Sequence, residues 1–359
     1  MLPAFHNSLL LTFIGCDDTE GDDVQCLDPN NNVICYKYAP EQLKNLNHKN
    51  FSLIHFNIRS LNKHYDDMTS LLSTAHSNTF KIICCTETLL SHRSYVNMLN
   101  LDGYTLHHKD RPARQGGGVC MYVHSSLHAN VCDDLSINHN ETDSLFVEIN
   151  NRTGKNLIVG VIYRPPESDR PSFIEELDKL LLLINNSNKD CLLLGDYNID
   201  ISQNPRSTTT KNDFINTLHS YSFYPTINIP TRVTATSKTI IDNIITNIHN
   251  TKIESGVIVT DISDHFPVFL SANLDQKGQS PRPPVKTRVV NERTLHRLAE
   301  SMQAKEWDTV YLCTDPNTAY NRLVDEISKS IHTCLPIRSV TRSRLDQTPW
   351  LTKGLLNSI

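Results

Sequence analysis

The sequence predicts an α/β or α+β domain in which the strands form two sheets. Short apolar segments alternate with segments of helical spacing along residues 51–274. Hairpin-like polar loops separate the apolar segments, which favours a two-sheet arrangement over a purely parallel sheet. No uninterrupted apolar run in the 359 residues approaches the roughly 18 residues that a membrane helix needs. We therefore expect a globular protein.

The first predicted strand is the β-prone apolar segment 51–56, and a helix is predicted over 60–74. In that helix Leu61, Tyr65 and Met68 recur at spacings of three or four residues, which places them on one face. Further short apolar segments predict strands at 81–86, 119–123, 145–149, 157–163 and 191–195.

A helix with a start signal lies between the last two of these strands. Pro171 and Ser172 precede Phe173, and Glu175 stands three residues after Ser172, which is the spacing of a capping box. The predicted apolar face of this helix consists of Leu177, Leu180, Leu181 and Ile184. After it, the sequence predicts a helix over 211–221 and strands over 240–246, 256–259 and 267–270.

The two ends of the chain differ in composition from the central region. Residues 1–50 gather five acidic side chains between positions 17 and 23, which predicts an acidic leader of low order. Residues 276–284 contain Gly, Ser and three Pro, a linker signature. The pattern beyond them is mostly helical, so residues 277–359 are expected to form a linker and helical segment outside a domain of residues 51–276.

The cysteines and the first residues indicate the compartment. None of the ten cysteines forms a Cys-x-x-Cys pair, and several lie in apolar runs, as expected of free thiols in a reducing compartment. The apolar run 9–14 has no basic flank and no clear cleavage site, so no signal peptide is expected. We expect a nuclear or cytoplasmic protein.

Charge is unevenly distributed along the chain. The net charge is −5, but residues 277–359 carry 13 basic and 8 acidic side chains, whereas residues 1–276 carry 21 and 31. A domain that binds nucleic acid usually has a basic excess, and the main body has none. If this protein handles DNA or RNA, a local basic patch or bound metal ions must offset the phosphate charge.

The sharpest chemical feature follows the strand at 191–195. The sequence Gly195-Asp196-Tyr197-Asn198 delivers a carboxylate and, two residues later, a carboxamide on the same side of an extended chain. Asp196 can orient or deprotonate a water, and Asn198 can donate to an anionic oxygen without adding charge. The alternative interpretation is a strand that ends in an Asx-type turn.

Two further carboxylates could act with a histidine. In Ser263-Asp264-His265 a carboxylate beside an imidazole can fix its tautomer and raise its basicity, provided that a turn or bulge brings the two side chains together. Asp242 is a charge inside an apolar strand and needs a partner, such as His265 or an Asn. The alternative is one ordinary loop histidine among sixteen.

More polar residues end other predicted strands. Glu87 suits a hard divalent cation such as Mg²⁺, and Asn57 can bind a metal through its carbonyl oxygen. The phenol of Tyr163 or the guanidinium of Arg164 could hold a phosphate. Taken singly, each residue has a simpler interpretation: a solvated loop acid, a helix cap, or a core-edge tyrosine before a proline stop.

Taken in order, these residues resemble the motif series of the endonuclease/exonuclease/phosphatase superfamily, the fold of DNase I-like nucleases and apurinic/apyrimidinic endonucleases. The residues that carry this resemblance are Asn57, Glu87, Tyr163, Gly195-Asp196-Tyr197-Asn198, Asp242 and Ser263-Asp264-His265. Other motifs resemble the endonuclease domain of LINE-type (non-LTR) retrotransposons. They are Phe56-Asn57-Ile58-Arg59-Ser60-Leu61, Gly117-Gly118-Val119, Tyr163-Arg164-Pro165-Pro166, Pro230-Thr231-Arg232 and Ile241-Asp242-Asn243-Ile244.

The resemblance covers roughly residues 51–274 and implies a four-layer α/β sandwich, with two packed mixed β-sheets, helices outside and a cleft at one end. It implies that Glu87, with help from Asn57, holds Mg²⁺ or Mn²⁺, which neutralises phosphate charge and stabilises the leaving oxygen. Asp196 would then activate the attacking water, and Asn198 would orient the substrate or the developing oxyanion.

The resemblance also implies roles for the histidine side of the cleft. His265, steered by Asp264, would contact the scissile phosphate or assist the leaving group. Tyr163 would donate to the phosphate, and Asp242 would support the histidine.

The implied activity is that of a metal-dependent phosphodiesterase that nicks duplex DNA to make a primer end for reverse transcription. Residues 349–355 resemble the segment that joins such a nuclease to a reverse transcriptase, but the sequence stops at Ile359. We therefore expect a truncated retrotransposon protein, with element RNA a partner only of the full-length parent and no membrane partner. The alternatives are a non-catalytic or domesticated remnant that binds nucleic acid or a partner, and a same-fold enzyme that hydrolyses sphingomyelin or an inositol phosphate.

Overall fold

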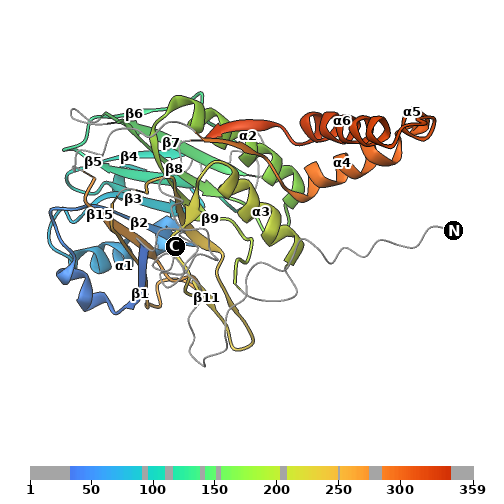
Figure 1. The fold of residues 1–359 in the computed structure, drawn as a ribbon. Helices are drawn as coiled ribbons and strands as arrows, with labels where there is room; N and C mark the ends of the chain where they lie inside the picture. The colour runs from blue at the N-terminus through green and yellow to red at the C-terminus, as the bar shows by residue number, and fades with distance from the viewer. Residues whose placement is uncertain are drawn as a thin grey trace, which may run out of the picture.

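The computed structural model consists of two β-sheets packed face to face, with helices on their outer faces (Figure 1). The predicted α/β class with two packed mixed sheets is therefore confirmed. The structure describes residues 33–90, 96–109, 116–137, 142–150, 155–202, 208–249, 251–274 and 285–340. The acidic cluster at 17–23 and the predicted linker at 276–284 lie outside the described residues.

The first sheet has seven strands. Their order in space is β1 (Val33–Tyr38), β14 (Ile253–Ile258), β15 (Val268–Ala272), β2 (Phe51–Asn57), β3 (Phe80–Thr86), β5 (Val119–His124) and β4 (Tyr104–Lys109). The central neighbours β2 and β3 run parallel, whereas β15 and β5 pair with them in antiparallel fashion. The sheet is therefore mixed.

The second sheet has six strands. Their order in space is β10 (Tyr224–Pro225), β13 (Asp242–Thr246), β9 (Asp190–Asp196), β8 (Leu157–Tyr163), β7 (Asp143–Ile149) and β6 (Ala129–Val131). Its centre is the parallel pair of β8 and β9. The side chains of β9 are buried on both faces because the strand lies between the other sheet and a helical layer, which explains its continuous apolar run.

Alternating side chains of the first sheet belong to two separate cores. Leu53 of β2 belongs to the core between the sheets, whereas its neighbour Ile54 packs in the core under α1 (Leu61–Ser73). The helices α2 (Arg170–Ser187) and α3 (Thr208–Ser220) contribute to the first of these cores from the outside of the second sheet (Figure 1). The layers are therefore helix, sheet, sheet and helix.

The start of α2 differs from the prediction. The helix begins at Arg170, and its N-cap is Asp169, whose Oδ2 accepts from the backbone N–H of Ser172 at 2.9 Å. The predicted capping box at Ser172 is therefore wrong. A carboxylate caps a helix as well as a hydroxyl does, so Asp169, three residues before Ser172, can serve as the N-cap.

The predicted low-order leader is wrong for residues 33–45, which form regular elements. Strand β1 and the 3₁₀ helix η1 (Pro40–Asn45) both lie within residues 1–50, and β1 extends the first sheet by pairing in parallel with β14. The partner of β1 lies more than 200 residues away in the chain. A short edge strand with a distant partner gives no local pattern that would distinguish it from a polar leader.

The remaining short elements lie outside the two sheets. They are η2 (Val96–Leu99) and the ribbon of β11 (Arg232–Val233) with β12 (Lys238–Thr239). The backbone of Arg232 at the base of this ribbon forms an isolated bridge with His265. The ribbon is therefore tied to the segment that carries the predicted catalytic histidine.

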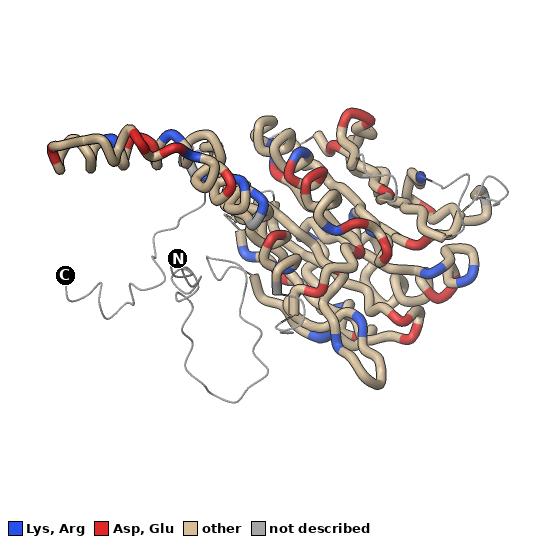
Figure 2. The backbone as a smooth tube through the Cα atoms, turned by 90° about the vertical axis from the view of Figure 1, so that its right-hand side faces the viewer, with Lys and Arg blue, Asp and Glu red and all other residues tan. Residues whose placement is uncertain are grey.

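The C-terminal residues form an arm that projects from the sheets (Figures 1 and 2). It consists of β16 (Val285–Arg288), α4 (Glu292–Gln303), α5 (Asp308–Tyr311), α6 (Pro316–Cys334) and β17 (Ile337–Val340). Its helical pattern was predicted, but the ribbon of β16 and β17 was not. An ion pair of 2.7 Å between Arg293 Nη1 and Glu175 Oε2 links the arm to α2.

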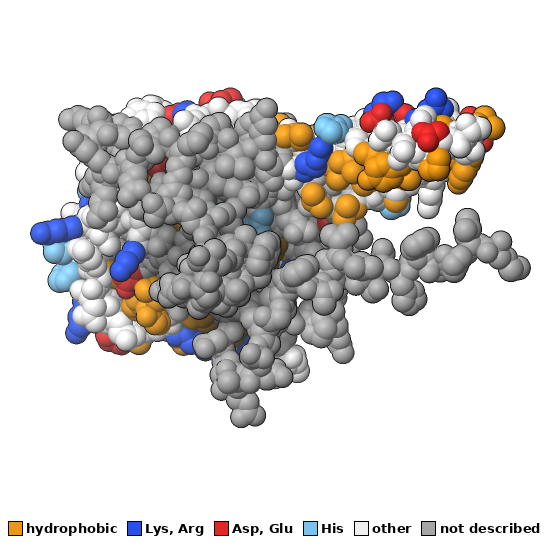
Figure 3. All heavy atoms as spheres, viewed as in Figure 1, with side chains coloured by type: hydrophobic (Ala, Val, Ile, Leu, Met, Phe, Trp, Pro, Cys, Tyr) orange, Lys and Arg blue, Asp and Glu red, His pale blue; other side chains and the backbone are white. Residues whose placement is uncertain are grey.

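The surface of the arm is mixed in charge and partly apolar. Residues 285–340 carry eight basic and seven acidic side chains, interspersed along the helices (Figure 2). Apolar side chains gather along one side of the arm (Figure 3), and Tyr311, Leu312 and Tyr320 are exposed. Across all the described residues, no helix is both long and apolar enough to cross a membrane.

Candidate active site

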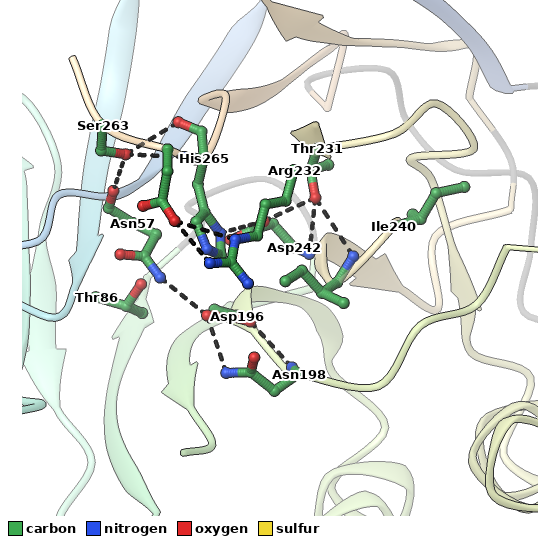
Figure 4. A network of polar contacts seen from close by, with 12 residues as sticks. Asn57, Thr86, Asp196, Asn198, Thr231, Arg232, Ile240, Asp242, Ser263 and His265 are labelled. Atoms are coloured by element: carbon green, nitrogen blue, oxygen red, sulfur yellow. Dashed lines mark hydrogen bonds and ion pairs between the residues drawn. The ribbon is translucent and has the colours of Figure 1, made fainter. Parts of the chain in front are cut away.

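Predicted site residues from both sheets meet at one end of the sandwich. Asn57 ends β2, and Glu87 follows the end of β3, its parallel neighbour. Asp196 ends β9 and stands opposite Tyr163 of β8 and Asp242 of β13 in the strand register. Strand ends that are far apart in sequence therefore deliver polar side chains to one place (Figure 4).

Asp196 is fully buried and held from two sides. Its Oδ2 accepts from Nδ2 of Asn57 at 2.9 Å and from Nδ2 of Asn198 at 3.1 Å, and its Oδ1 accepts from the Asn198 backbone N–H at 2.9 Å (Figure 4). Burial, followed by the charge of Asp242, raises the pKa of Asp196 to about 8. The direction of this carboxyl group is therefore fixed.

His265 and Asp242 form a buried pair. Nδ1 of His265 lies 2.8 Å from Oδ2 of Asp242, and the two side chains are 4% and 1% exposed. Burial by itself disfavours the charged ring, but the Asp242 carboxylate outweighs it and raises the pKa of His265 to about 9. Burial likewise opposes the charge of Asp242, but His265 holds the pKa of this carboxyl below its usual range. The imidazolium form is thus favoured, with Nε2 as a second donor.

A hydroxyl fixes the carboxylate of this pair. Thr231 Oγ1 donates to Asp242 Oδ2 at 2.7 Å and accepts from the backbone N–H groups of Ile241 and Asp242. Asp242 Oδ1 is buried without a hydrogen-bond partner among the described residues. The partner that the sequence suggested for Asp242, His265, is the one that the structure supplies.

The Asp264 side chain does not make the contact with His265 that was predicted for it. Instead of contacting the adjacent His265 ring, it accepts from Nε and Nη2 of Arg232, at 3.0 and 2.8 Å, and pairs with Nη1 of Arg59 at 2.9 Å. The segment bends at residues 261–264, and the Asp264 carboxylate faces the guanidinium groups of Arg59 and Arg232 while the His265 ring lies buried against Asp242. The expectation that Asp264 steers His265 is therefore wrong, and Asp242 makes that contact.

Glu87 is held beside Asn57 by a run of backbone hydrogen bonds. The N–H groups of Ile58, Ser60 and Leu61 donate to the carbonyls of Thr86, Glu87 and Thr88, respectively, which joins the two strand ends. Glu87 has a φ of +52°, a left-handed conformation that turns its side chain inward. Its Oε1 accepts from Asn57 Nδ2 at 3.0 Å.

The residues present fit a divalent cation at this place. Asn57 Oδ1 is buried and has no hydrogen-bond partner among the described residues, and it lies on the same amide that contacts the Glu87 and Asp196 carboxylates. Mg²⁺ prefers oxygen ligands such as carboxylates and amide carbonyls, and Glu87 and Asn57 offer one of each. Asp196, Asp242 and His265 also offer ligand atoms within 4.8 Å of one another.

Tyr163 and Arg164 behave differently. Tyr163 is 6% exposed at the end of β8, opposite Asp196 in the strand register. Arg164 is fully buried, and its guanidinium donates to the carbonyls of Tyr197, Asn198 and Ser168. The suggestion that Arg164 holds a phosphate is therefore wrong, because its side chain faces the interior and not the site.

Several site residues were not predicted. Arg59 and Arg232 hold Asp264 at the rim, Thr231 holds Asp242, and Ser263 Oγ donates to the Asn57 carbonyl at 2.7 Å. In the sequence, Arg59, Thr231 and Arg232 stand in the side motifs that resemble retrotransposon endonucleases, and Ser263 stands in the Ser263-Asp264-His265 motif of the superfamily series. Their contacts join segments that are far apart in the chain, so no local spacing could reveal them.

Residues 54–265 match the profile of the Endonuclease/Exonuclease/phosphatase family, so the chain belongs to this family. Its fold is similar to that of the AP endonuclease LMAP from Leishmania major, with a TM-score of 0.51 and 14% identity over 62% of this chain and 88% of that one. The endonuclease domain of TRAS1, a telomere-specific non-LTR retrotransposon, aligns with a TM-score of 0.48 and 14% identity over 63% of this chain and all of that one. At such identities the similarity concerns the fold alone. Comparison with curated proteins gives no match.

Proposed function

We propose that this protein is a divalent-metal-dependent phosphodiesterase that nicks duplex DNA. The observation that carries the proposal is the buried group of Asp196, Asp242 and His265 at the end of the sandwich, in a member of a family of phosphate-ester hydrolases. A buried acid of raised pKa beside a cationic imidazole provides both a proton acceptor and a donor to a phosphate.

Each residue has a defined task in this proposal. Asp196 takes the proton of the attacking water, and its direction is set by Asn57 and Asn198. The Nε2–H of His265 donates to the phosphate as its charge grows, while Asp242 keeps the ring charged and in place. Tyr163 contributes a phenol hydroxyl from the end of the neighbouring strand.

The cation belongs at Glu87 and the carbonyl oxygen of Asn57. When bound there, Mg²⁺ or Mn²⁺ would neutralise phosphate charge and stabilise the leaving oxygen. In addition, Arg59 and Arg232 place two half-exposed guanidinium groups at the rim, which would bind flanking phosphates of a nucleic-acid backbone. These local positive charges would offset phosphate repulsion by the acidic excess of residues 1–276.

The choice of duplex DNA rests on the side motifs that resemble LINE-type endonucleases, including Phe56-Asn57-Ile58-Arg59 and Pro230-Thr231-Arg232. In the structure both motifs flank Asp264 at the rim of the site, where a backbone phosphate would approach. The same motifs support an origin in a non-LTR retrotransposon. They give no support to a lipid or inositol-phosphate substrate.

The test is the conversion of supercoiled plasmid to open circles by the full chain, with Mg²⁺ and with EDTA. Parallel reactions with sphingomyelin and with inositol phosphates cover the other substrates of this fold. We expect nicking only with the metal and no turnover of the other substrates. Undiminished nicking in EDTA would exclude the metal mechanism, and absence of any hydrolysis would favour a binding remnant.

A further inference from the structure

Arg164 is the largest fully buried side chain of the described residues, and it lies directly beneath the segment that carries Asp196 and Asn198. It follows Tyr163, the last residue of β8, and enters the core between that strand and α2. Its Cζ lies 6.0 Å from the ring centroid of Phe173. A permanently charged group in such a place is costly unless its donors are satisfied.

The guanidinium donors of Arg164 are divided between two segments, the loop at residues 197–198 and Ser168. Nε donates to the Tyr197 carbonyl at 2.7 Å, and Nη2 donates to the Asn198 carbonyl at 2.8 Å. Nη1 donates to both the carbonyl and the Oγ of Ser168, each at 2.8 Å, which anchors the far end of the fork. Four hydrogen bonds therefore fix one planar group between two segments.

The backbone of Arg164 makes two more contacts with the same loop. Its N–H donates to the Asp196 carbonyl at 3.0 Å, and its carbonyl accepts from Asn198 Nδ2 at 2.8 Å. That same Nδ2 also donates to Asp196 Oδ2. The Asn198 carboxamide is thus oriented jointly by the Arg164 carbonyl and by the Asp196 carboxylate.

Asn198 has a left-handed backbone conformation, with a φ of +47°, which asparagine adopts more readily than most residues with a side chain. The hydrogen bonds that hold it there are the Asn198 N–H to Asp196 Oδ1 and the Arg164 guanidinium to the Asn198 carbonyl. Lysine could supply the charge at position 164, but it could not contact both carbonyls and Ser168 with a planar fork.

We infer that Arg164 is a positioning residue of the catalytic site, which sets Asp196 and Asn198 for reaction without touching the substrate. This inference rests on the proposed phosphodiesterase function. It assigns to the Arg of Tyr163-Arg164-Pro165-Pro166 an inward role, distinct from phosphate binding. A displacement of about 1 Å in a reacting group can cost about 10²-fold in rate, so the position of the loop matters.

The test uses Arg164→Lys in the full chain, with kcat and KM measured on a duplex oligonucleotide and Mg²⁺. The expected result is a kcat about 10²-fold lower with KM within about twofold of the wild-type value, since the rim arginines that meet the backbone are unchanged. Leu180→Val, a core change on α2, is the control that lowers the melting temperature without lowering kcat. A wild-type kcat in Arg164→Lys overturns the inference.

A double-mutant cycle with Asn198→Ala separates positioning from general support of the fold. If Arg164 acts through this loop, Arg164→Lys should cost less than about threefold in kcat once Asn198 is alanine, because residues that act as one unit are not additive. A full multiplicative loss overturns the inference. Should Arg164→Lys not fold, Ser168→Ala takes its place, since it removes one anchor of the guanidinium; an unchanged kcat there also overturns the inference.

The two proposals fail separately. Inactivity of the wild-type chain on DNA with Mg²⁺ contradicts the proposed function, whatever the variants do. Activity of the wild type together with full activity of Arg164→Lys contradicts only the positioning role. Hydrogen exchange gives a readout without turnover: the amides of residues 196–198 should exchange faster in Arg164→Lys, while those of β7 remain as in the wild type.

Discussion

Three titratable side chains share one buried space at the end of the sheets, and their charges must balance. Asp196 and Asp242 are both acids, and the His265 imidazole interacts electrostatically with both of them. The His265 ring is hydrogen-bonded to Asp242, which favours the charged form of this carboxylate. Asp196 is therefore the acid whose pKa rises. This asymmetry gives two chemically similar residues different tasks.

We expect His265→Ala and Asp242→Ala each to lower kcat by at least about 10²-fold, a typical effect of losing a positioned donor to a phosphate. The double variant should fall well short of the product of the two losses, because Asp242 acts through the ring. Plasmid nicking rates measure both effects. His219→Ala, on the surface of α3, is the matched control and should retain full activity.

We expect Glu87→Gln to lose most metal-dependent activity while the fold remains intact, because the change removes a negative charge and keeps the shape. Titration calorimetry with Mg²⁺ should show weaker binding by this variant than by wild type. Glu167→Gln, in an exposed loop, should bind as wild type does. Equal Mg²⁺ affinity in Glu87→Gln and wild type would remove Glu87 from the cation site.

The sequence indicated which residues belong to the candidate site more accurately than it indicated which of them contact one another. Asn57 and Asp196 could be predicted because each ends an apolar strand, and Glu87 because it directly follows one. The role of Asp264 could not, since the sequence does not show how the bend at residues 261–264 turns its side chain away from the ring. Arg164 was placed toward a phosphate because burial of a guanidinium cannot be seen in a motif.

At the level of elements, β9 reaches the site through a position that only glycine can occupy. Gly195 has a φ of +155°, and a Cβ there would lie 1.8 Å from the Ile162 carbonyl oxygen of β8. The parallel strands β8 and β9 therefore approach each other without a side chain between them, immediately before Asp196. The position of Asp196 depends on this close contact.

We expect Gly195→Ala to destabilise the fold by more than about 3 kcal/mol, because the obstacle is backbone and cannot move aside. Thermal melting measures the loss. Gly116→Ala is a matched control: its φ of +91° is also left-handed, but nothing lies within 4 Å of the added carbon. It should cost only about 1–2 kcal/mol. Equal melting temperatures for the two variants would contradict the steric argument.

Elements with a clear pattern of apolar residues in the sequence were predicted, and several elements without one were missed. The central strands β2, β3, β8 and β9 are continuous apolar runs, and α1 shows helical spacing, so all five appeared close to their observed bounds. The edge strand β1 and the two-residue strands β10 to β12 were missed. Their pairing depends on distant partners and not on their own composition.

At the level of the whole molecule, the C-terminal arm of residues 285–340 contributes no residue to the candidate active site. The family match ends at residue 265, and β15 closes the first sheet at Ala272. Residues 285–340 are nearly balanced in charge, so the basic excess of the tail lies in residues 277–284 and 341–359. We therefore propose that residues 277–359 form a segment separate from the nuclease domain.

A chain that ends at residue 276 should fold with a cooperative melting transition and should still nick plasmid at low salt. Its affinity for duplex DNA should be lower and should depend less steeply on salt, because fewer basic side chains release counterions. Binding titrations at several salt concentrations, beside the full chain, measure this. Aggregation or a broad transition would instead mean that the arm supports the fold through contacts such as Arg293 with Glu175.

The isosteric variant Asp196→Asn tests whether Asp196 is the base of a metal-dependent nuclease site. The measurement is the single-turnover rate of plasmid nicking with Mg²⁺ for wild type and Asp196→Asn, which keeps the shape of the side chain and removes its charge. We predict metal-dependent nicking by wild type and a loss of at least about 10²-fold in the variant, with an unchanged melting profile. Nicking by Asp196→Asn at the wild-type rate would contradict the account.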